Sequence, residues 1–498
     1  MSARAGPLEA PPAVRARSSR ANALILAAAL SVAAVFLAAQ LFVPPVVGLA
    51  DNGDYERVMG YAGFQHTTAD PAERYYTFFR TRYAVVSPGW FRGGYHSSET
   101  LLAYAARLVH LAFSRGALFD IRVLGAIHAA LFLLALAGIL RACRGLAVST
   151  QVVAAALLVF FFTDVGYVAP FNSFYSQTAS LLFLLLTAAA AAEAIRRGRL
   201  DGALLTAYFG AALLFVGSKP QEAPSSAVLA LFGARLAGVR LAPAGVWKKP
   251  AAWLAVGLCV FGVWYARHVP RTLRAATMYQ VVFDDLLEYS PSPKDDAAAL
   301  DLPLGWMSYR GTNPYAPDSP LLDPGFQARF LERTGFRRVL GFYALHPDRL
   351  AGRVGRAADH VWSLRPVLGN FEKSEEHPRV AMATRFSLWS RARASLGAFP
   401  LGATALLLLG NLAAVLATRR GSSASGRLFR DGVVVLVLLS GLSFGVVVLA
   451  QAPTDESRSL YAHHALCDLL LIADAGWIVE TLTTRRRTRR GAAASAGV

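Results

Sequence analysis

The feature that most constrains this chain is a series of apolar runs that are long enough to cross a lipid bilayer. Roughly 20 apolar residues in a helix cross about 30 Å of hydrocarbon. The runs lie near residues 22–47, 120–140, 148–163, 175–195, 202–217, 223–239, 250–267, 396–417, 431–450 and 460–482. They predict an all-α polytopic membrane protein with about ten transmembrane helices.

Composition supports a membrane protein and argues against nucleic-acid binding. Hydrophobic residues make up 55% of the 498 residues and charged residues only 16%, against roughly 25% in soluble domains. The net charge is +18, but the basic residues gather in short clusters between the apolar runs. Such clusters are typical of membrane-orientation signals, so we expect no nucleic-acid partner. Cys143, Cys259 and Cys467 lack paired spacing, and neither a disulfide framework nor a zinc site is expected.

The basic clusters also predict the orientation of the chain. When the N-terminus is placed in the cytoplasm, every loop that becomes cytoplasmic is basic, as the positive-inside rule requires. These clusters are Arg141/Arg144, Arg196/Arg197/Arg199, Arg235/Arg240/Lys248/Lys249, Arg419/Arg420/Arg427/Arg430 and Arg485–Arg487 with Arg489/Arg490. Both termini are therefore predicted to be cytoplasmic, and the first apolar run to be an uncleaved span. The loops facing outward are then 48–119, 164–174, 218–222, 268–395 and 451–459.

This orientation divides the chain into five parts. A basic cytoplasmic segment, 1–21, precedes an N-terminal transmembrane module, 22–267, which includes the first external loop, 48–119. The segment 268–395 has ordinary soluble composition and is long enough for a small extracytoplasmic domain. C-terminal transmembrane helices occupy 396–482, and a basic cytoplasmic tail occupies 483–498.

The first external loop contains a predicted interfacial helix. Ser97 precedes apolar residues at three- and four-residue steps, from Leu101 through Leu108 to Phe113. A Ser cap followed by this spacing predicts an amphipathic helix. Because the helix has an apolar face and no length to cross the bilayer, we expect it to lie in the membrane interface.

An acidic string opens the same loop, directly after the first predicted span. Asp51, Asp54 and Glu56 lie within six positions. Because charged side chains near a bilayer are energetically costly, such a cluster suggests a function. Gly53 between two acids permits a tight turn. On a continuing helix Glu56 points away from Asp54, so Glu56 has a flanking role. The alternative is that all three acids form a solvated helix end.

Polar residues in the other external loops are expected at the same face of the bilayer. They are Asn172, Gln177, Lys219, Gln221, Glu222 and Arg458. Carboxylates, amides and cations together supply a general base, a sugar-binding wall and a phosphate site. Simpler roles stay open: capping or helix contacts for Asn172 and Gln177, an interfacial anchor for Lys219, and a local ion pair to Asp455 or Glu456 for Arg458.

The order of these strings resembles a known family. An apolar span, a D-x-x-D-Y-x-R motif at Asp51–Arg57 and many later spans resemble the GT-C superfamily of membrane glycosyltransferases. The strings Pro170-Phe171-Asn172-Ser173-Phe174-Tyr175-Ser176-Gln177, Lys219-Pro220-Gln221 and Glu456-Ser457-Arg458 followed by Asp468 resemble more narrowly the WsfD-like hexosyltransferases of bacterial glycan assembly. The resemblance covers roughly residues 20–480 and carries nothing diagnostic within 268–395.

The resemblance implies an inverting transferase of a hexose or pentose in the bacterial cytoplasmic membrane, with its active site outside. Its donor would be a sugar on a polyprenyl phosphate, and its acceptor a cell-envelope glycan, lipid or protein. Asp54, or Asp51, would be the general base. Lys219 and Arg458 would stabilise the leaving phosphate, and Asn172 and Gln177 would bind sugar hydroxyls, with Gln221 and Glu222 also at the substrate. No cofactor is certain; if Mg²⁺ or Mn²⁺ is used, Asp51 and Asp54 would hold it.

Two other functions compete with this interpretation. A glycan ligase or polymerase also uses polyprenyl-linked glycans on the outer face, but relies more on arginine and histidine. A transporter or flippase of lipid-linked glycans would place ionisable groups within the spans and show internal repeats. The sequence shows no convincing repeat, and its apolar runs are nearly free of charge.

Overall fold

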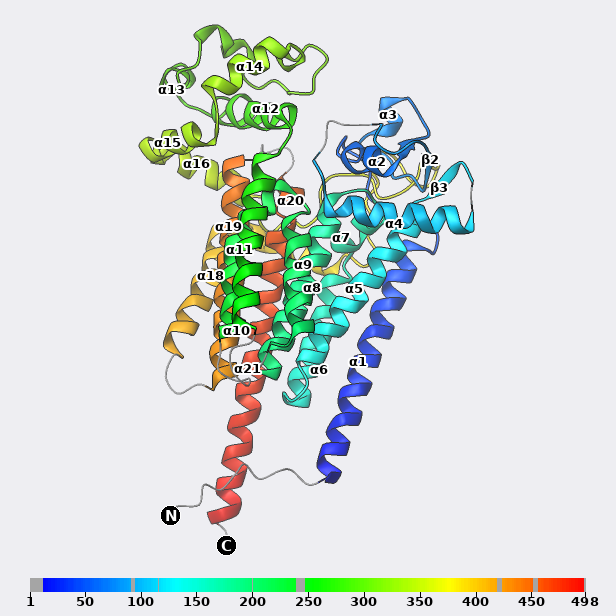
Figure 1. Cartoon of the computed structure of the whole chain (residues 1–498), viewed down its shortest axis with the longest axis vertical. Coiled ribbons are helices and arrows are strands. Elements are labelled where there is room, and N and C mark those ends of the chain that lie inside the picture. The colour runs from blue at the N-terminus through cyan, green and yellow to red at the C-terminus, as the bar shows by residue number, and fades with distance from the viewer. Residues whose placement is uncertain are drawn as a thin grey trace.

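The computed structural model describes residues 12–90, 95–114, 116–198, 200–238, 247–418, 423–450 and 456–496, and these are mostly helical (Figure 1). Each predicted apolar run forms a helix that packs into one bundle. The helices are α1 (Pro12–Leu41), α5 (Arg122–Ala142), α6 (Val148–Phe162), α8 (Ser176–Arg197), α9 (Gly202–Val216), α10 (Ser225–Gly238), α11 (Lys248–Arg267), α18 (Pro400–Ala417), α19 (Ala424–Ala450) and α21 (Tyr461–Ala496).

Six helices of the described chain are long and apolar enough to cross a membrane: α1, α5, α8, α11, α18 and α19. A seventh span arises if α6 and the following segment Val165–Asn172, which bends by 60°, count as one. The prediction of about ten spans is therefore not confirmed. The 15-residue α9 and the 14-residue α10 rise only about 21–23 Å, short of the hydrocarbon thickness. The third exception, α21, carries Asp468, Asp474 and Glu480.

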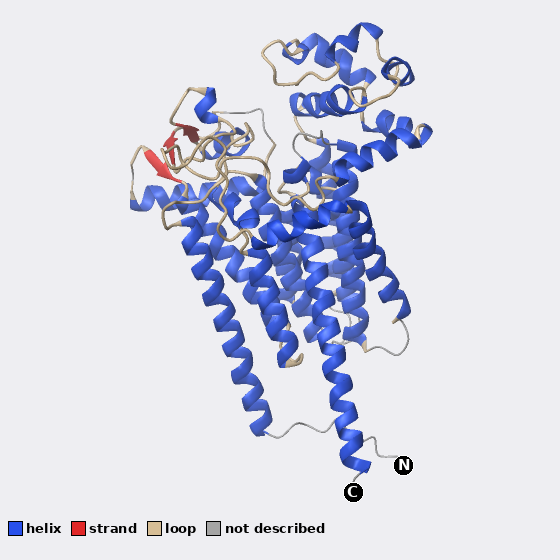
Figure 2. Cartoon of the chain, turned by 180° about the vertical axis from the view of Figure 1, so that it is seen from behind, coloured by secondary structure: helices blue, strands red, loops and turns tan. Residues whose placement is uncertain are grey.

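The described ends of the chain lie at one end of the bundle, and the two large loops cover the other end (Figures 1 and 2). The basic clusters predict that both termini lie on one side of the membrane and the two large loops on the other, and the structure places them at opposite ends of the bundle in this way. Which side of a membrane each end faces stays a prediction. The basic residues Arg199, Arg240, Arg419 and Arg420 and most of segment 1–21 lie outside the described residues.

The first external loop folds into a small α/β lobe. It contains α2 (Glu56–Ala62), α3 (Pro71–Arg74), α4 (Ser98–Phe113) and an antiparallel sheet of β1 (Phe64–His66), β2 (Arg82–Val85) and β3 (Leu118–Asp120). Phe64 pairs with Val85, and Tyr83 pairs with Phe119. The all-α prediction missed this sheet because strands of three or four residues are too short to show alternation.

Helix α4 has the predicted cap and two distinct faces. The Ser97 hydroxyl accepts a hydrogen bond from the Glu99 backbone N–H at 3.1 Å, which begins the helix. The side of α4 that carries Ala103 and Ala106 is buried against α2 and α5. The opposite face exposes the apolar side chains Leu101, Leu108 and Phe113. Figure 1 shows α4 lying across the ends of the bundle helices, as an interfacial helix would.

The first half of segment 268–395 forms a second, helical lobe with its own apolar core. It consists of α12 (Arg271–Tyr279), η3 (Gln280–Leu286), α13 (Pro293–Ala299), η4 (Leu304–Tyr309), η5 (Pro320–Leu322), α14 (Pro324–Arg333), α15 (Phe336–Leu345) and α16 (Pro347–Ala358). Phe283, Phe326 and Phe330 are buried in its core, and Trp306 and Tyr309 pack against them. These two aromatic residues therefore belong to the lobe core.

The second half of that segment returns across the first lobe. Gly48 donates a backbone hydrogen bond to Asn370, and the Asn370 side chain donates back to the Gly48 carbonyl at 2.9 Å. Beyond this contact, α17 (Leu388–Ser395) and η6 (Leu396–Ala398) lead into α18. The loop 268–395 is therefore one separate lobe followed by a covering strap, rather than a single domain.

A buried ion pair fastens α17 to the bundle. Arg393 and Asp468 are both fully buried, and Arg393 donates to the Asp468 carboxylate. Asp468 also accepts hydrogen bonds from the Tyr167 hydroxyl at 2.7 Å and the Trp389 indole at 2.9 Å. Arg393 further donates to His464 Nδ1 at 2.9 Å. His464 therefore belongs to this buried structural network.

Candidate functional site

The acidic string forms a tight turn at the start of α2. Asp51 Oδ1 accepts backbone hydrogen bonds from Gly53 at 2.7 Å and Tyr55 at 3.1 Å. Gly53 has φ of 101°, a conformation that favours glycine. The other Asp51 oxygen lies 2.8 Å from His66 Nε2, and the Asp51 side chain is only 1% exposed. Asp51 therefore holds the turn and binds the β1 histidine.

Asp54 faces a different set of partners, which come from distant parts of the chain. Its Oδ1 lies 2.7 Å from Arg57, and its Oδ2 forms an ion pair with Arg458 of α20 (Glu456–Ser459). Arg458 also donates to Asn52 Oδ1 at 2.8 Å. The Arg458 guanidinium lies 4.5 Å from the ring centre of Tyr175, an arrangement that stabilises a cation. Arg458 thus bridges the last loop to the first.

The charges around Asp54 decide its protonation. Burial alone would raise the pKa of Asp54, but the positive charges of Arg458, Arg57 and Lys219 outweigh burial and lower the pKa to about 2. The side chain remains 25% exposed, so the carboxylate is ionised and still reachable from solvent. Lys219 precedes η2 (Pro220–Glu222), and its effect on Asp54 brings the third external loop to the same site.

Glu222 is the second carboxyl group near Lys219. It is 4% exposed, and burial raises its pKa from 4.5 to about 7, although the Lys219 charge opposes this rise. Beside it, the Oε1 and Nε2 atoms of Gln221 are buried without a hydrogen-bond partner among the described residues. The η2 turn therefore presents a carboxyl group that titrates near neutrality and an amide with unused hydrogen-bonding capacity.

The remaining predicted site residues lie deeper or to one side. Asn172 is fully buried, and its side-chain N–H group donates to the carbonyls of Leu41 at 3.1 Å and Val47 at 2.9 Å. This pins the end of η1 (Ala169–Asn172), which follows α7 (Val165–Val168), to the end of α1. Gln177 is 4% exposed near the start of α8. Glu56 pairs with Arg74, in keeping with a flanking role.

The structure assembles Asp54, Lys219 and Arg458 as one cluster, with Glu222 beside Lys219. Residues that the sequence reasoning did not select are Arg57, Asn52, Tyr175 and Tyr315. Arg57 stands three residues after Asp54, and this i,i+3 spacing on a helix was an available signal. Tyr315 lies 258 positions from Arg57, and its hydroxyl accepts from Arg57 at 3.5 Å, a contact with no sequence signal.

Within the described ranges, no group of three or more His, Cys, Asp or Glu side chains is close enough to bind a metal ion. The predicted partners of Arg458 within its own loop also stay open in part, because Asp455 and the rest of 451–455 lie outside the described residues. What the structure does describe is a pair of arginines and a lysine around one ionised carboxylate.

The apolar helices and the polar cluster at one end of the bundle define a multi-pass membrane protein. The chain belongs to the family of the YfdI N-terminal transmembrane domain, whose family model matches residues 14–495. No curated protein and no solved structure matches the chain. The family supports the prediction of a polytopic membrane protein, whereas the narrower resemblance to GT-C and WsfD-like enzymes stays a prediction.

Proposed function

We propose that this protein is a glycosyltransferase that moves a sugar from a polyprenyl-phosphate donor to a cell-envelope glycan, lipid or protein acceptor. Transfer would take place on the outer face of the bacterial cytoplasmic membrane. The observation that carries the proposal is the cluster of Asp54, Arg57, Lys219 and Arg458. One partly exposed site thus combines a carboxylate with three cations that are suited to a phosphate.

The cations suit the phosphate of the donor. Arg458 and Arg57 each present a guanidinium whose planar set of N–H groups matches phosphate oxygens. Charge that grows on the departing phosphate would be stabilised by Arg458 and Lys219. The buried Gln221 amide, which has no partner among the described residues, is a suitable group for a sugar hydroxyl.

The low pKa of Asp54 shapes the mechanism. A carboxylate with a pKa of about 2 is a weak base while Arg458 holds it. When donor phosphate draws Arg458 away, the pKa of Asp54 rises, because a nearby positive charge has been withdrawn. Donor binding would thereby activate the base.

The transfer step then balances as a single displacement. The acceptor oxygen attacks the anomeric carbon, and the bond from that carbon to the phosphate oxygen breaks, with the electron pair leaving on the phosphate. Asp54 takes the proton of the acceptor hydroxyl. Glu222, whose pKa is about 7, is the alternative proton acceptor in the same cluster.

A lipid-borne donor requires an active site at the membrane interface, and α4 supplies a seat for it. Leu101, Leu108 and Phe113 expose an apolar face of α4, which belongs to the same lobe as Asp54. A polyprenyl chain cannot leave the bilayer, whereas a polar acceptor arrives from water. An interfacial helix beside an exposed carboxylate meets both requirements.

The test is the envelope glycan of a bacterial strain in which the native copy is replaced. Asp54→Asn should abolish one glycan modification that the wild-type gene restores. Asp70→Asn is the matched control, since Asp70 is an exposed acid of the same loop that caps α3. Unchanged glycan in the Asp54→Asn strain, with protein levels equal, would refute the proposal. Loss of a whole polymer rather than of one sugar would favour a ligase or polymerase.

A further inference from the structure

A second basic site lies in the helical lobe, outside the Asp54 cluster. We propose that the cavity between the end of α11 and the start of α15 binds the phosphate headgroup of an anionic membrane lipid. The cavity has a volume of about 490 Å³, within the usual range for small-molecule sites. This inference does not depend on the proposed transferase activity, because the cavity and the Asp54 cluster share no residue.

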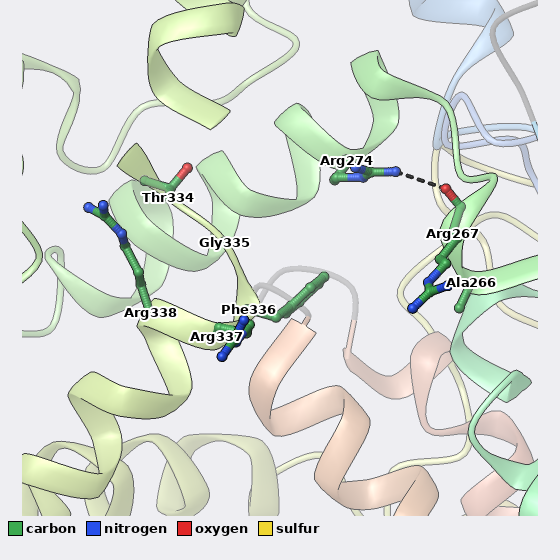
Figure 3. Close-up of a pocket in the computed structure, with 8 residues that line it drawn as sticks. All are labelled: Ala266, Arg267, Arg274, Thr334, Gly335, Phe336, Arg337 and Arg338. Carbon is green, nitrogen blue, oxygen red and sulfur yellow. Dashed lines mark hydrogen bonds between the residues drawn. The ribbon is translucent and has the colours of Figure 1, made fainter. Parts of the chain in front are cut away.

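Arginines form both walls of the cavity (Figure 3). Arg267 and Arg274 come from the α11–α12 side, and Arg337 and Arg338 come from the first turn of α15. The lining contains no acidic residue in the part of the chain that is described. Four arginines line one cavity, and only Arg338 lies near a carboxylate in the described residues, so the cavity favours an anion.

Two of these arginines are held by protein groups and two are available. Arg274 donates to the backbone carbonyls of Arg267 at 3.0 Å and Val269 at 3.3 Å, which fixes its direction. Arg338 donates to the Arg333 carbonyl at 2.9 Å and lies 3.5 Å from Asp301. By contrast, Arg267 and Arg337 have exposed side chains and no carboxylate partner among the described residues. A bound anion would satisfy both of them.

The position of the cavity indicates that the anion is part of a lipid. Ala266 and Arg267 end α11, a helix that is apolar enough to cross the membrane, so the cavity floor lies at a membrane boundary. Trp264, one turn earlier, is 46% exposed, and tryptophan is enriched at such boundaries.

The α15 wall carries apolar groups beside its arginines. Phe336 lines the cavity and is 42% exposed, and Leu340, one turn later on the same side of α15, extends the exposed apolar surface. An amphipathic helix with arginines next to exposed Phe and Leu side chains is suited to the headgroup–acyl boundary. A free inorganic phosphate would use the arginines but would leave this apolar surface uncovered.

Native mass spectrometry of the full-length protein in detergent tests the proposal. The probes are dioctanoyl phosphatidylglycerol, dioctanoyl phosphatidylcholine and inorganic phosphate. The test variant is Arg267→Gln with Arg337→Gln, which removes two charges and keeps side-chain length. The matched control is Arg310→Gln with Arg329→Gln, since both residues are exposed on the same lobe and do not line the cavity.

The wild type and the control should bind phosphatidylglycerol in preference to phosphatidylcholine, and the test variant should bind it about 25-fold more weakly. This follows from about fivefold per removed charge near a lipid headgroup. Equal weakening in both double variants, no effect in either, or no preference over phosphatidylcholine would overturn the proposal. Binding of inorganic phosphate without phosphatidylglycerol would overturn the assignment to a lipid. Unchanged unfolding temperatures would show that the exposed substitutions preserve the fold.

Discussion

The buried Arg393–Asp468 pair allows a quantitative prediction about the bundle. Asp468 accepts from three donors, namely Arg393, Tyr167 and Trp389. Asp468→Leu would leave a fully buried guanidinium without its counter-charge, which costs about 3–5 kcal/mol. The orphaned Tyr167 and Trp389 donors add about 1–3 kcal/mol each, and the lower ends of these ranges together give an expected loss of at least about 5 kcal/mol.

The reverse substitution should cost less. Arg393→Met leaves the Asp468 carboxylate with two neutral donors, and we expect a loss of about 3 kcal/mol. The double variant removes both charges together and should recover most of the stability that Asp468→Leu alone loses. Asp474→Leu is the matched control in α21, because the Asn411 amide is the single donor to Asp474 among the described residues, and it should cost about 1 kcal/mol.

The assay is unfolding in detergent followed by tryptophan fluorescence. Trp362 and Trp389 report directly, since the Arg393 guanidinium lies 4.9 and 5.9 Å from their ring centres. Additive losses in the double variant would refute the reasoning, because additivity means that the two charges do not interact. A loss below about 1 kcal/mol for Asp468→Leu would refute it as well, since a buried charge left alone cannot be so well tolerated.

Three further predictions concern the external face. Burial raises the pKa of Glu222 from 4.5 to about 7, so both folded and unfolded states hold the proton at pH 4, and only the folded state holds it near pH 6. The free energy of unfolding should therefore fall by up to about 3 kcal/mol between pH 4.5 and 8. In Glu222→Gln this fall should be absent, and a variant whose free energy of unfolding depends on pH as in the wild type would contradict the prediction. Arg458→Lys keeps the charge but loses the guanidinium group whose N–H groups contact both Asn52 and Asp54. It should lower the rate of glycan transfer at least about tenfold without changing expression. Transfer at the wild-type rate would contradict a role for these two contacts. A spin label attached at Leu108→Cys should collide more often with lipid-soluble oxygen than with a water-soluble nickel chelate, as measured by spin relaxation. More frequent collisions with the nickel chelate would contradict an interfacial position of α4.

The helices of the bundle were predictable from the sequence because a helix that crosses a bilayer needs a continuous apolar run of roughly 20 residues. The apolar runs near 148–163, 202–217 and 396–417, for example, form α6, α9 and α18 within a few residues of the predicted bounds. The Ser97 cap likewise predicted the start of α4. The number of crossings was less predictable, because α9 and α10 are shorter than the hydrocarbon is thick.

The site was predictable only in part. Asp54, Lys219 and Arg458 could be selected because charged side chains close to a membrane are energetically costly, and the structure brings these three residues together. The sequence did not indicate which of the two aspartates faces the cations. The Gly53 turn and the contact between His66 and the Asp51 carboxylate decide this, and both appear only in the folded chain. Contacts between residues far apart in the chain, such as the pairing of Arg57 with Tyr315, leave no local pattern.

Sugar transfer by the purified full-length protein is the most direct test of the proposed role of Asp54 in transfer from a lipid phosphate. The protein would be supplied with radiolabelled polyprenyl-phosphate glucose, mannose, galactose or arabinose together with envelope extract as acceptor. We expect the wild type and Asp70→Asn to consume one of these donors and label the acceptor, while Asp54→Asn loses at least about 100-fold in rate. Equal rates for Asp54→Asn and the wild type would contradict this expectation, and so would a wild type that consumes none of the four donors.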